Sequence, residues 1–261
     1  NKFFAGVSRC IEERAKSYGY TVLFASSDEN AERLSSVMDA VLAHNIDGVI
    51  VAPCTGGDDA VRKATEAGVP VVLLDRDIVD MENVGKVLLD DVEAGAMATK
   101  LFLARGYRKI EMISYSLGIS SLEERESGYR KAMIEQGLEQ DVKVHYTSYA
   151  NAAQDVPGII RDAVSRGVEA MFLPTYSLSA LVLMTMRDLG LRTPEDMAVI
   201  GFDVSDIYQL YSTSVTHIVQ PLKELGEKSV DVLVNMIQGK PAEKAVLKPE
   251  MIEGDSTSAK A

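Results

Sequence analysis

Short runs of apolar residues alternate along this chain with longer stretches in which apolar residues recur every three or four positions. The short runs predict buried strands, and the longer stretches predict amphipathic helices. The predicted helices begin near residues 4, 29, 58, 92, 122, 152, 178 and 221, and most of them end just before a glycine, which favours a helix end. The predicted strands span 21–25, 47–53, 69–75, 86–90, 109–114, 142–147, 169–175, 197–203, 215–219 and 244–252.

This order of elements predicts an α/β fold. Apolar strands that alternate with helices form parallel sheets flanked by helices on both faces. The strands are more numerous than one open sheet usually holds, so the pattern favours two doubly wound, Rossmann-like lobes. No stretch rich in Gly, Pro or Ser separates them, and we therefore expect several tight crossings. The first helix starts near Phe4 with no strand before it, so we expect the first strand to lie upstream of Asn1.

Composition narrows the range of partners. The 261 residues are 46% hydrophobic, with a net charge of −12 and a pI of about 4.8. An acidic surface repels DNA phosphates, so these residues are not expected to make the main contact with nucleic acid. No apolar stretch is long enough to span a bilayer, and no membrane partner is expected. Cys10 and Cys54 form no CxxC motif, and buried thiols of this kind favour a cytoplasmic protein.

Motifs for catalysis and metal binding are missing from the sequence. It contains no GxSxG elbow, Walker loop, GxGxxG or HExxH. The histidines at 44, 145 and 217 fall on separate predicted elements and lack the spacing of metal ligands. The glycine-containing loop at 54–60 carries two acids that would repel a phosphate. We therefore expect no enzymatic activity, no metal site and no cofactor.

Polar side chains follow several predicted strands at the points where the strands end. Asp75, Asp90 and Asp203 each close an apolar run, and Thr175 and Tyr176 close another. In open α/β sheets, ligands bind beyond the carboxyl ends of the strands. One such acid could be a helix cap or turn residue. Their recurrence instead favours a neutral, polyhydroxylated ligand, because carboxylates accept hydrogen bonds from hydroxyls and a nearby arginine donates to them.

Motif blocks occur in a fixed order over essentially the whole chain. The chain opens with "NKFF", and "VLLDDVEAGAMATKLFLARGYRKI" is similar to a D-N-x-x-G-A segment. "RESGYRKAMIEQGL" fits R-x-x-G-[FY]-x-x-A-L, and "LRTPEDMAVIGFDV" fits L-x-x-P-x-D-[VI]-x-[VI]-[VI]-G-[FY]-D. "SVTHIVQPLKELG" fits T-x-[VI]-x-Q-P followed by a glycine. Together these blocks resemble the effector-binding region of the lac-repressor (LacI/GalR) family of bacterial transcription regulators.

The resemblance implies two Rossmann-like lobes of the periplasmic-binding-protein type, with a ligand cleft between them. Crossings near Met112, Gln220 and Lys244 would divide the chain into an N-terminal lobe, 1–112 plus 221–243, and a C-terminal lobe, 113–220 plus 244–261. It also implies a helix-turn-helix headpiece of roughly sixty residues, absent from this chain, that binds operator DNA. Effector binding would alter operator affinity through a coupling of roughly 1–3 kcal/mol.

Matched position by position, the motifs also imply a ligand site. Its carboxylates would accept hydrogen bonds from ligand hydroxyls, its arginine would donate, and the aromatic at 149 would stack on the ligand. Core packing is the alternative role of the two phenylalanines, and a surface ion pair with Glu126 is the alternative role of the arginine. The ligand-binding positions are Phe3, Phe4, Asp90, Arg125, Tyr149, Thr175, Tyr176 and Asp203.

Two departures from the motifs concern the ligand. The family usually carries Asn-Asp where this chain has Thr175-Tyr176, and its usual Asp-Asn is here Asp90-Asp91. Tyrosine is bulkier and is not an ionised acceptor at neutral pH. The sequence therefore names no particular sugar, and it names neither the operator nor the sign of regulation.

The helix at 178–186, "LSALVLMTM", is apolar on nearly all sides, whereas one buried face needs only a stripe. Either its own lobe covers it on two sides or it faces a second subunit. The resemblance implies a homodimer, because two DNA half-sites require two headpieces, and this favours the second alternative.

The sequence is compatible with three alternative functions. The favoured one is the effector-binding and dimerisation region of a cytoplasmic regulator that senses a sugar or sugar derivative. A periplasmic sugar-binding protein of a transporter or sensor would share the fold, and a signal peptide upstream would identify it. A Rossmann-like enzyme, such as a sugar-phosphate isomerase, would need a catalytic base that the sequence does not provide.

Overall fold

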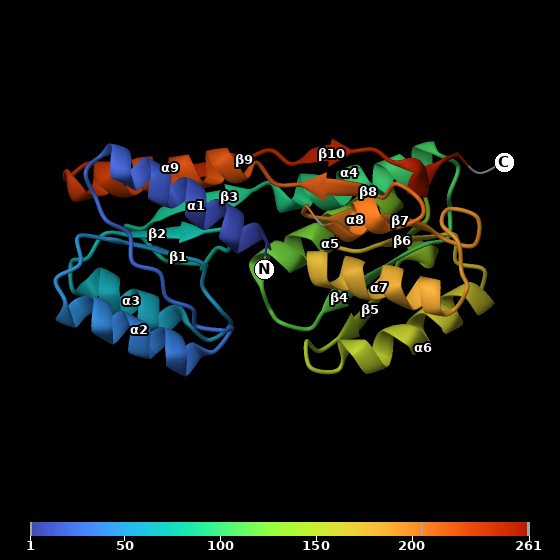
Figure 1. Ribbon diagram of the computed structural model, residues 1–261, viewed down its shortest axis with the longest axis horizontal. Coiled ribbons are helices and arrows are strands. Elements are labelled where there is room, and N and C mark those ends of the chain that lie inside the picture. The colour runs from blue at the N-terminus through green and yellow to red at the C-terminus, as the bar shows by residue number, and fades with distance from the viewer. Residues whose placement is uncertain (1, 205, 260–261) are drawn as a thin grey trace. The chain divides into compact units, whose positions relative to one another are not determined.

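The computed structural model describes residues 2–204 and 206–259, and contacts within the chain divide it into two compact units (Figure 1). Among the described residues, no helix combines the length and the apolar content needed to cross a bilayer. The first unit consists of Asn1–Asp90, Gly118–Ser121 and Pro221–Leu247, and the second of Asp91–Leu117, Leu122–Gln220 and Lys248–Ala261.

One predicted division is corrected. The sequence placed the first crossing near Met112, but the chain passes from the first unit to the second between Asp90 and Asp91. The reason is strand pairing, because the strand around Met112 forms ladders with two strands of the second unit. The other divisions follow Gln220 and Leu247, where crossings near Gln220 and Lys244 were predicted.

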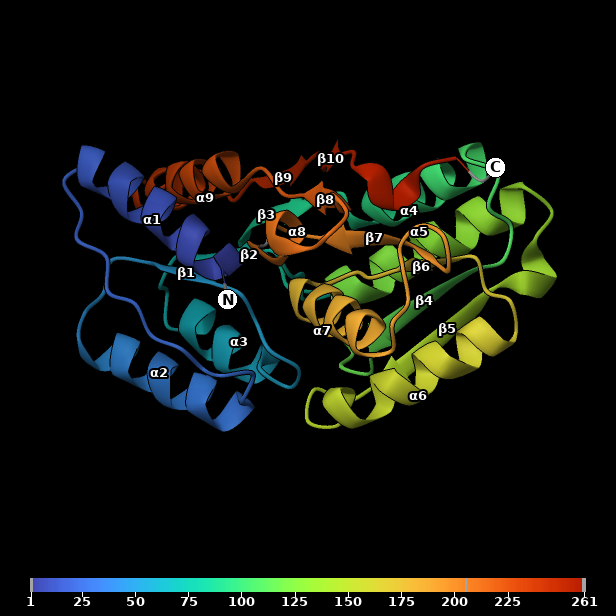
Figure 2. The same cartoon turned by 45° about the vertical axis from the view of Figure 1, so that its right-hand side comes forward.

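The first unit contains a parallel sheet in the order β1–β2–β3–β9. Successive side chains of a strand point to opposite faces. Val72 and Leu74 of β2 therefore join a core with α1 and α9, while Val71 and Leu73 join a core with α2 and α3 (Figure 2). The bounds are α1 Lys2–Ser17, α2 Ala31–Ala43, β1 Val49–Val51, α3 Asp58–Glu66, β2 Val71–Leu74, β3 Gly85–Leu89, α9 Leu222–Ile237 and β9 Lys244–Leu247.

Two predicted strands differ from the structure. Residues 21–25 form no strand, and Leu23 and Phe24 are 78% and 57% exposed. A strand needs a ladder partner, and β1 is paired only with β2 within the described residues. The predicted strand at 244–252 is divided into β9 and β10, which belong to different sheets. Pro249 lies between them and has no N–H for a ladder.

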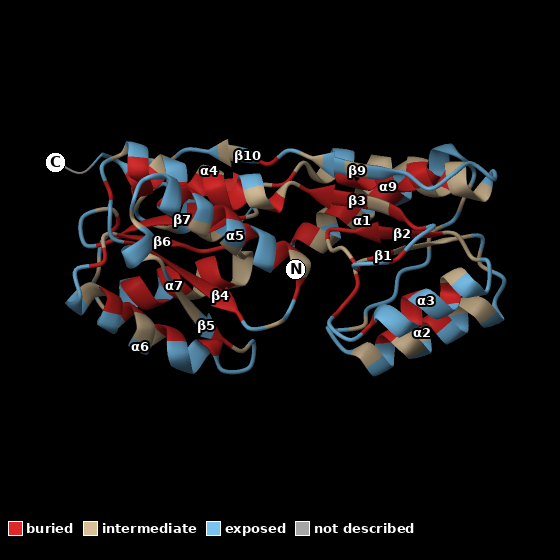
Figure 3. Ribbon diagram, turned by 180° about the vertical axis from the view of Figure 1, so that it is seen from behind, coloured by how far each residue is buried: buried red, intermediate tan, exposed pale blue. Residues whose placement is uncertain are grey.

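The second unit contains a sheet in the order β10–β8–β7–β6–β4–β5, in which only the β10–β8 pair is antiparallel. Figure 3 shows its central strands as buried and its helices as exposed on their outer sides. The strands are β4 Ile110–Tyr115, β5 Lys143–Thr147, β6 Ala170–Phe172, β7 Ala198–Phe202, β8 Thr216–Val219 and β10 Glu250–Ile252. The helices are α4 Asp91–Ala104, α5 Ser120–Glu135, α6 Ala152–Ser165, α7 Tyr176–Asp188 and α8 Asp206–Leu210, with 3₁₀ turns η1 Glu139–Asp141 and η2 Asp255–Thr257.

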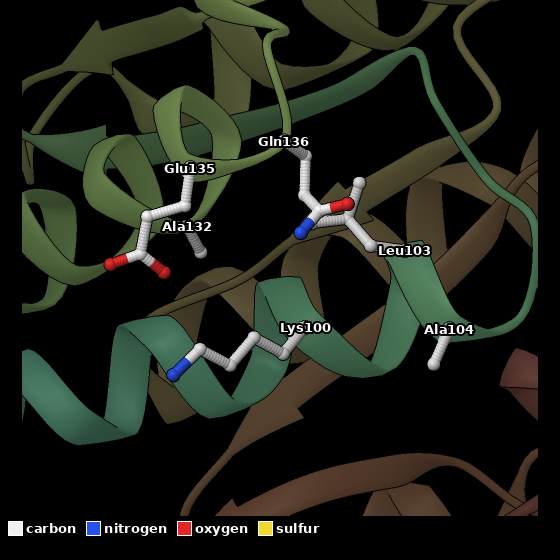
Figure 4. A pocket seen from close by; sticks show the side chains of 6 residues that line it. All are labelled: Lys100, Leu103, Ala104, Ala132, Glu135 and Gln136. Carbon is white, nitrogen blue, oxygen red and sulfur yellow. The ribbon is translucent and has the colours of Figure 1, made fainter.

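Right-handed crossovers place α5 on the opposite face of this sheet from α6 and α7. Helices α4 and α5 approach so closely that only glycine fits where they cross. A Cβ on Gly95 would lie 1.9 Å from the carbonyl oxygen of Arg125, and one on Gly128 would lie 2.0 Å from that of Val92. Toward their C-terminal ends the two helices leave an open pocket of about 300 Å³, lined by Lys100, Leu103, Ala104, Ala132, Glu135 and Gln136 (Figure 4).

Helix α7 is covered largely within its own unit. Its buried side chains include Leu178, Val182, Leu183 and Met186, and the helix packs against α6 and β7. Met184 is 45% exposed. This arrangement supports the first of the two alternatives for the apolar helix. The homodimer stays a prediction that concerns the exposed side chains of α7, such as Met184, and exposed surface elsewhere.

Candidate functional site

Polar and aromatic residues collect at the carboxyl edge of the sheet in the second unit. Because β4 to β8 run parallel, the residues that follow them meet at one edge. Five of the predicted positions, Arg125, Tyr149, Thr175, Tyr176 and Asp203, lie in this unit. The residues at the strand ends are Tyr115 of β4, Tyr149 after β5, Thr175 and Tyr176 after β6, Asp203 after β7 and Gln220 after β8.

Arg125 of α5 is held on three sides and is only 4% exposed. Its Nε donates to Oδ1 of Asp91 at 2.6 Å, and its Nη1 donates to the carbonyl oxygen of Pro174 at 2.7 Å. The guanidinium carbon lies 3.7 Å from the ring centroid of Phe202, a cation–π contact. The alternative of a surface pair with Glu126 or its neighbours is wrong, because Arg125 is buried and pairs with Asp91, while Glu126 pairs with Arg130.

Asp203 adopts a left-handed backbone conformation, with φ of 61°, immediately after β7. Such a conformation is uncommon outside glycine, although Asp and Asn adopt it more readily than most residues. Its N–H donates to the carbonyl oxygen of Ile218 at 2.8 Å, and its Oδ1 accepts from Nε2 of Gln220 at 2.9 Å. These bonds fix the direction of the carboxylate.

Gln220 is the clearest residue that the sequence reasoning missed. It is 7% exposed, and its Oε1 has no hydrogen-bond partner among the residues that the structure describes. A buried polar atom without a partner costs about 1–3 kcal/mol, so it favours a ligand donor at this position. The "QP" of the motif block "VTHIVQP" was the available signal, since this glutamine directly follows a strand.

Tyr208 of α8 is hydrogen-bonded to the end of β7, at the residue before Asp203. The hydroxyl of Tyr208 donates to the carbonyl oxygen of Phe202 at 2.8 Å and accepts from its N–H at 3.1 Å. Burial raises the pKa of Tyr208 well above its ordinary value, so the hydroxyl stays protonated and able to donate. The β7 end is therefore a rigid support for the aspartate.

Tyrosines line the other end of the edge. The rings of Tyr115 and Tyr149 lie 5.2 Å apart at an angle of 41°, and Tyr149 is 67% exposed. The Tyr115 hydroxyl lies 3.0 Å from Oγ of Ser177, and burial raises the pKa of Tyr115. Thr175 caps α7, where its Oγ1 accepts from the N–H of Leu178 at 3.2 Å. The sequence predicted Tyr149 as a ligand-binding residue but not Tyr115, whose ring packs against that of Tyr149.

The remaining three predicted positions lie in the first unit. Phe3 is 5% exposed within the α1/α9 core, so core packing describes it, and Phe4 is half-buried with its ring 5.0 Å from that of Phe3. Asp90 follows β3, and its N–H donates to the carbonyl oxygen of Leu247 at 2.8 Å.

A further polar cluster follows β2 in the first unit. Asp75 has φ of 68°, and the next residue, Arg76, is bidentate to Glu29, with both N–O distances 2.7 Å. Nη1 of Arg76 also donates to the carbonyl oxygen of Pro53 at 3.0 Å. Burial opposes the charge of Arg76, but the hydrogen bonds to Glu29 hold its pKa above the ordinary value. Glu29 was predicted to begin a helix, so no sequence pattern indicated this pairing.

The donor sets suit an organic polar ligand. Among the described residues, no group of three or more His, Cys, Asp or Glu is arranged to hold a metal ion. The edge of the second unit instead combines one guanidinium, one carboxylate, an amide and tyrosine rings, which together can hydrogen-bond hydroxyls and cover the C–H face of a ring.

These features define a ligand-binding domain of the periplasmic-binding-protein class. The model of the periplasmic binding protein domain matches residues 1–241, and the chain belongs to that family. Its curated relatives and structural neighbours are regulators of the lac-repressor type, as the motifs predicted.

Three relatives illustrate this similarity. The chain is 27% identical to the ribose operon repressor of Halalkalibacterium halodurans, over 92% of this chain and 71% of that protein. It is 26% identical to the HTH-type transcriptional repressor PurR of Vibrio atlanticus, over 97% of this chain and 77% of that protein. The structure of the transcription regulator CcpA of Lactococcus lactis superposes with a TM-score of 0.86 at 25% identity, covering 99% of this chain and 95% of that one.

Proposed function

We propose that this chain is the effector-binding region of a bacterial transcription regulator and that its effector is a small, polyhydroxylated molecule, a sugar or sugar derivative. The observation that carries the proposal is the collection of Arg125, Asp203, Gln220 and Tyr149 at one edge of the second unit. Thr175 and Tyr176 are proposed to contribute to the same ligand site, and Asp90, Phe3 and Phe4 stay proposed as ligand-binding positions of the first unit.

Each side chain has a distinct proposed role. Arg125 donates to ligand hydroxyls and Asp203 accepts from them, while the buried Oε1 of Gln220 accepts from a further donor. Tyr149, backed by Tyr115, covers the apolar face of the ring. The similarity to a ribose operon repressor supports a carbohydrate effector.

DNA binding is proposed to reside in a helix-turn-helix headpiece outside these residues. The relative PurR is named as an HTH-type repressor, and this chain spans 77% of its length. The net charge of −12 agrees with DNA contact being made elsewhere. Effector binding then regulates operator affinity, which requires that the ligand bind two states of the regulator with different affinities. A regulator of this kind acts in the cytoplasm and catalyses no reaction.

A homodimer is proposed because paired DNA half-sites require two headpieces. Large apolar side chains are exposed on and near α7 and α8, namely Met184, Val204 and Leu210, which are 45%, 50% and 84% exposed. These are the surface residues proposed for subunit contact.

The alternative function is that of a periplasmic sugar-binding protein. The name of the matching family describes that class, and the ligand chemistry would be the same. The curated relatives named above are repressors, and this favours the regulator.

Two observations on the intact gene and protein test the proposal. A helix-turn-helix encoded upstream of Asn1 is expected, whereas a basic segment, an apolar run and a cleavage site would identify a secreted binding protein. The full-length protein is then expected to bind operator DNA, and a bound sugar is expected to change the DNA affinity at least fivefold. In the Asp203→Ala variant the sugar is expected to leave the DNA affinity unchanged. Equal DNA affinity with and without a sugar that binds would contradict regulation.

A further inference from the structure

The arginine of the ligand site does not present a free positive charge. Arg125 is 4% exposed, and the carboxylate of Asp91, itself 2% exposed, lies 2.6 Å from its Nε. A buried ion pair of this geometry is close to neutral when seen from a distance. Its Nε and Nη1 are used by Asp91 and Pro174, which leaves the Nη2 group to donate to a ligand.

The rest of the edge adds negative charge only. The connections that follow β4, β5, β6 and β7, residues 116–119, 148–151, 173–175 and 203–206, contain no lysine or arginine. Asp203 adds a carboxylate at this edge and accepts a hydrogen bond from the uncharged Gln220. The formal charges of Asp91, Arg125 and Asp203 sum to −1.

The first unit repeats the arrangement independently. The guanidinium of Arg76, which follows β2, is bidentate to Glu29, and its Nε lies 3.6 Å from Oδ2 of Asp75. Its charge is therefore also offset by carboxylates. An anion that binds at either strand edge loses its water, and the arginine beside it is already paired with carboxylates. Desolvating a charge without such compensation is costly.

We propose that Asp91 determines the charge specificity of the site: by neutralising Arg125 from behind, it makes the second unit select an uncharged polyhydroxylated ring and reject the phosphate ester or the carboxylate of the same sugar. This inference rests on the proposed function and adds the ligand's charge to it. The Asp91–Arg125 pair does not weaken the binding of neutral hydroxyls, because the Nη2 group of Arg125 still donates to them and Asp203 still accepts from them. An anion is attracted by Arg125 and repelled by Asp91 and Asp203.

Calorimetric titration with matched probes tests this selectivity. The pairs are D-ribose and D-ribose 5-phosphate, D-glucose and D-glucose 6-phosphate, and D-galactose and D-galacturonate. For the pair that contains a ligand, the parent protein is expected to bind the neutral member at least tenfold more tightly than the anion. Asp91→Asn keeps the shape and the acceptor oxygen but removes the charge, and it is expected to move the neutral-to-anion ratio at least tenfold toward the anion.

The control is Asp188→Asn, which removes one charge from an exposed carboxylate at the end of α7. It is expected to leave the ratio unchanged. A purely structural role for Asp91 would weaken both members of a pair equally, and that result would overturn the proposal. Parent protein that binds an anion as tightly as its neutral partner would overturn it too, even if Asp91→Asn fails to fold. Binding of no member of any pair would instead count against the proposed function.

Discussion

At the scale of single residues, the site depends on side chains whose directions are fixed by other side chains. Arg125 is oriented by a carboxylate, a carbonyl oxygen and an aromatic ring, and Asp203 by an amide and a backbone bond. Fixed donors and acceptors lose little conformational entropy when a ligand binds, so each is expected to contribute strongly to affinity.

Arg125→Lys is expected to weaken ligand binding at least tenfold. Lysine keeps the charge but lacks the planar fork that reaches Asp91, Pro174 and a ligand together. Titration calorimetry with a sugar that binds the parent protein measures the effect. Arg130→Lys on the same helix is the control, because Arg130 is a half-buried residue paired with Glu126 and not with Asp91, and the affinity of this variant is expected to equal that of the parent. Equal losses in both variants would show that Arg125 has no special role.

Glu111 carries a separate prediction about pH. Despite its burial, hydrogen bonds from Arg166 and His145 lower the pKa of Glu111 from 4.5 to about 2. A folded-state pKa below the unfolded value stabilises the protein above pH 4.5, and the stabilisation is lost as the pH falls from about 4.5 to about 2. Glu111→Gln is therefore expected to lower the free energy of unfolding by roughly 3 kcal/mol at pH 7, and by clearly less at pH 3.

Urea denaturation at the two pH values measures this difference. Glu139→Gln, at an exposed position of η1, is the control and is expected to change stability by less than about 0.5 kcal/mol at either pH. A Glu111→Gln effect that does not shrink between pH 7 and pH 3 would show that the ion pairs are not its source.

Sequence patterns identified the residues at strand ends but not the residues that hold them. Asp203 and Arg125 stand in recognisable motifs, so they could be predicted. Asp91, Gln220 and Tyr115 act through contacts with residues 34, 17 and 34 positions away in the chain. Such pairings depend on the tertiary fold, so a local pattern can mark a position, as the "QP" motif marks Gln220, without indicating its partner. Burial of Phe3 likewise follows from packing against α9, which is distant in sequence.

At the scale of elements, the position of Arg125 depends on the tight crossing of α4 and α5. Gly95 faces the backbone of Arg125, and Gly128 faces the backbone of Val92. Side chains at these positions would separate the helices and displace the guanidinium from Asp91 and Phe202.

Gly95→Ala is expected to destabilise the protein by about 2–3 kcal/mol, because the new Cβ would lie 1.9 Å from a carbonyl oxygen that cannot move alone. It is also expected to weaken ligand binding by displacing Arg125. Gly158→Ala in α6 is the control, since nothing lies within 4 Å of its Cβ, and alanine there is expected to stabilise the helix by up to about 1 kcal/mol. Thermal unfolding measures both, and a neutral Gly95→Ala would contradict the tight crossing.

Helices and central strands followed the hydrophobic pattern, whereas edge segments did not. The segment at 21–25 has the composition of a strand but no ladder partner, and Pro249 divides the last predicted strand into two. Strand formation needs a neighbour, so composition alone overpredicts it at the edge of a sheet. The predicted crossing near Met112 differs for another reason, because ladders with β5 and β6 assign β4 to the second unit.

At the scale of the whole molecule, the account predicts self-association. Sedimentation velocity is expected to give a dimer for the parent, and Leu210→Asp combined with Met184→Asp is expected to give a monomer, because a charge in an apolar contact is costly. Ile134→Asp, at a position of α5 that is 51% exposed, is the control and is expected to stay dimeric. A parent protein that is monomeric at tens of micromolar, on the order of normal assay concentrations, would contradict the homodimer.

The central claim is that this chain binds a small polyhydroxylated effector at the carboxyl edge of the six-stranded sheet of its second unit. Titration calorimetry of the parent chain and of Asp203→Ala, against the same panel of neutral monosaccharides and disaccharides, tests it most directly. At least one sugar is expected to bind the parent, and Asp203→Ala is expected to weaken that binding at least tenfold. A sugar that binds both proteins with equal affinity, or a panel in which none binds the parent, would contradict it.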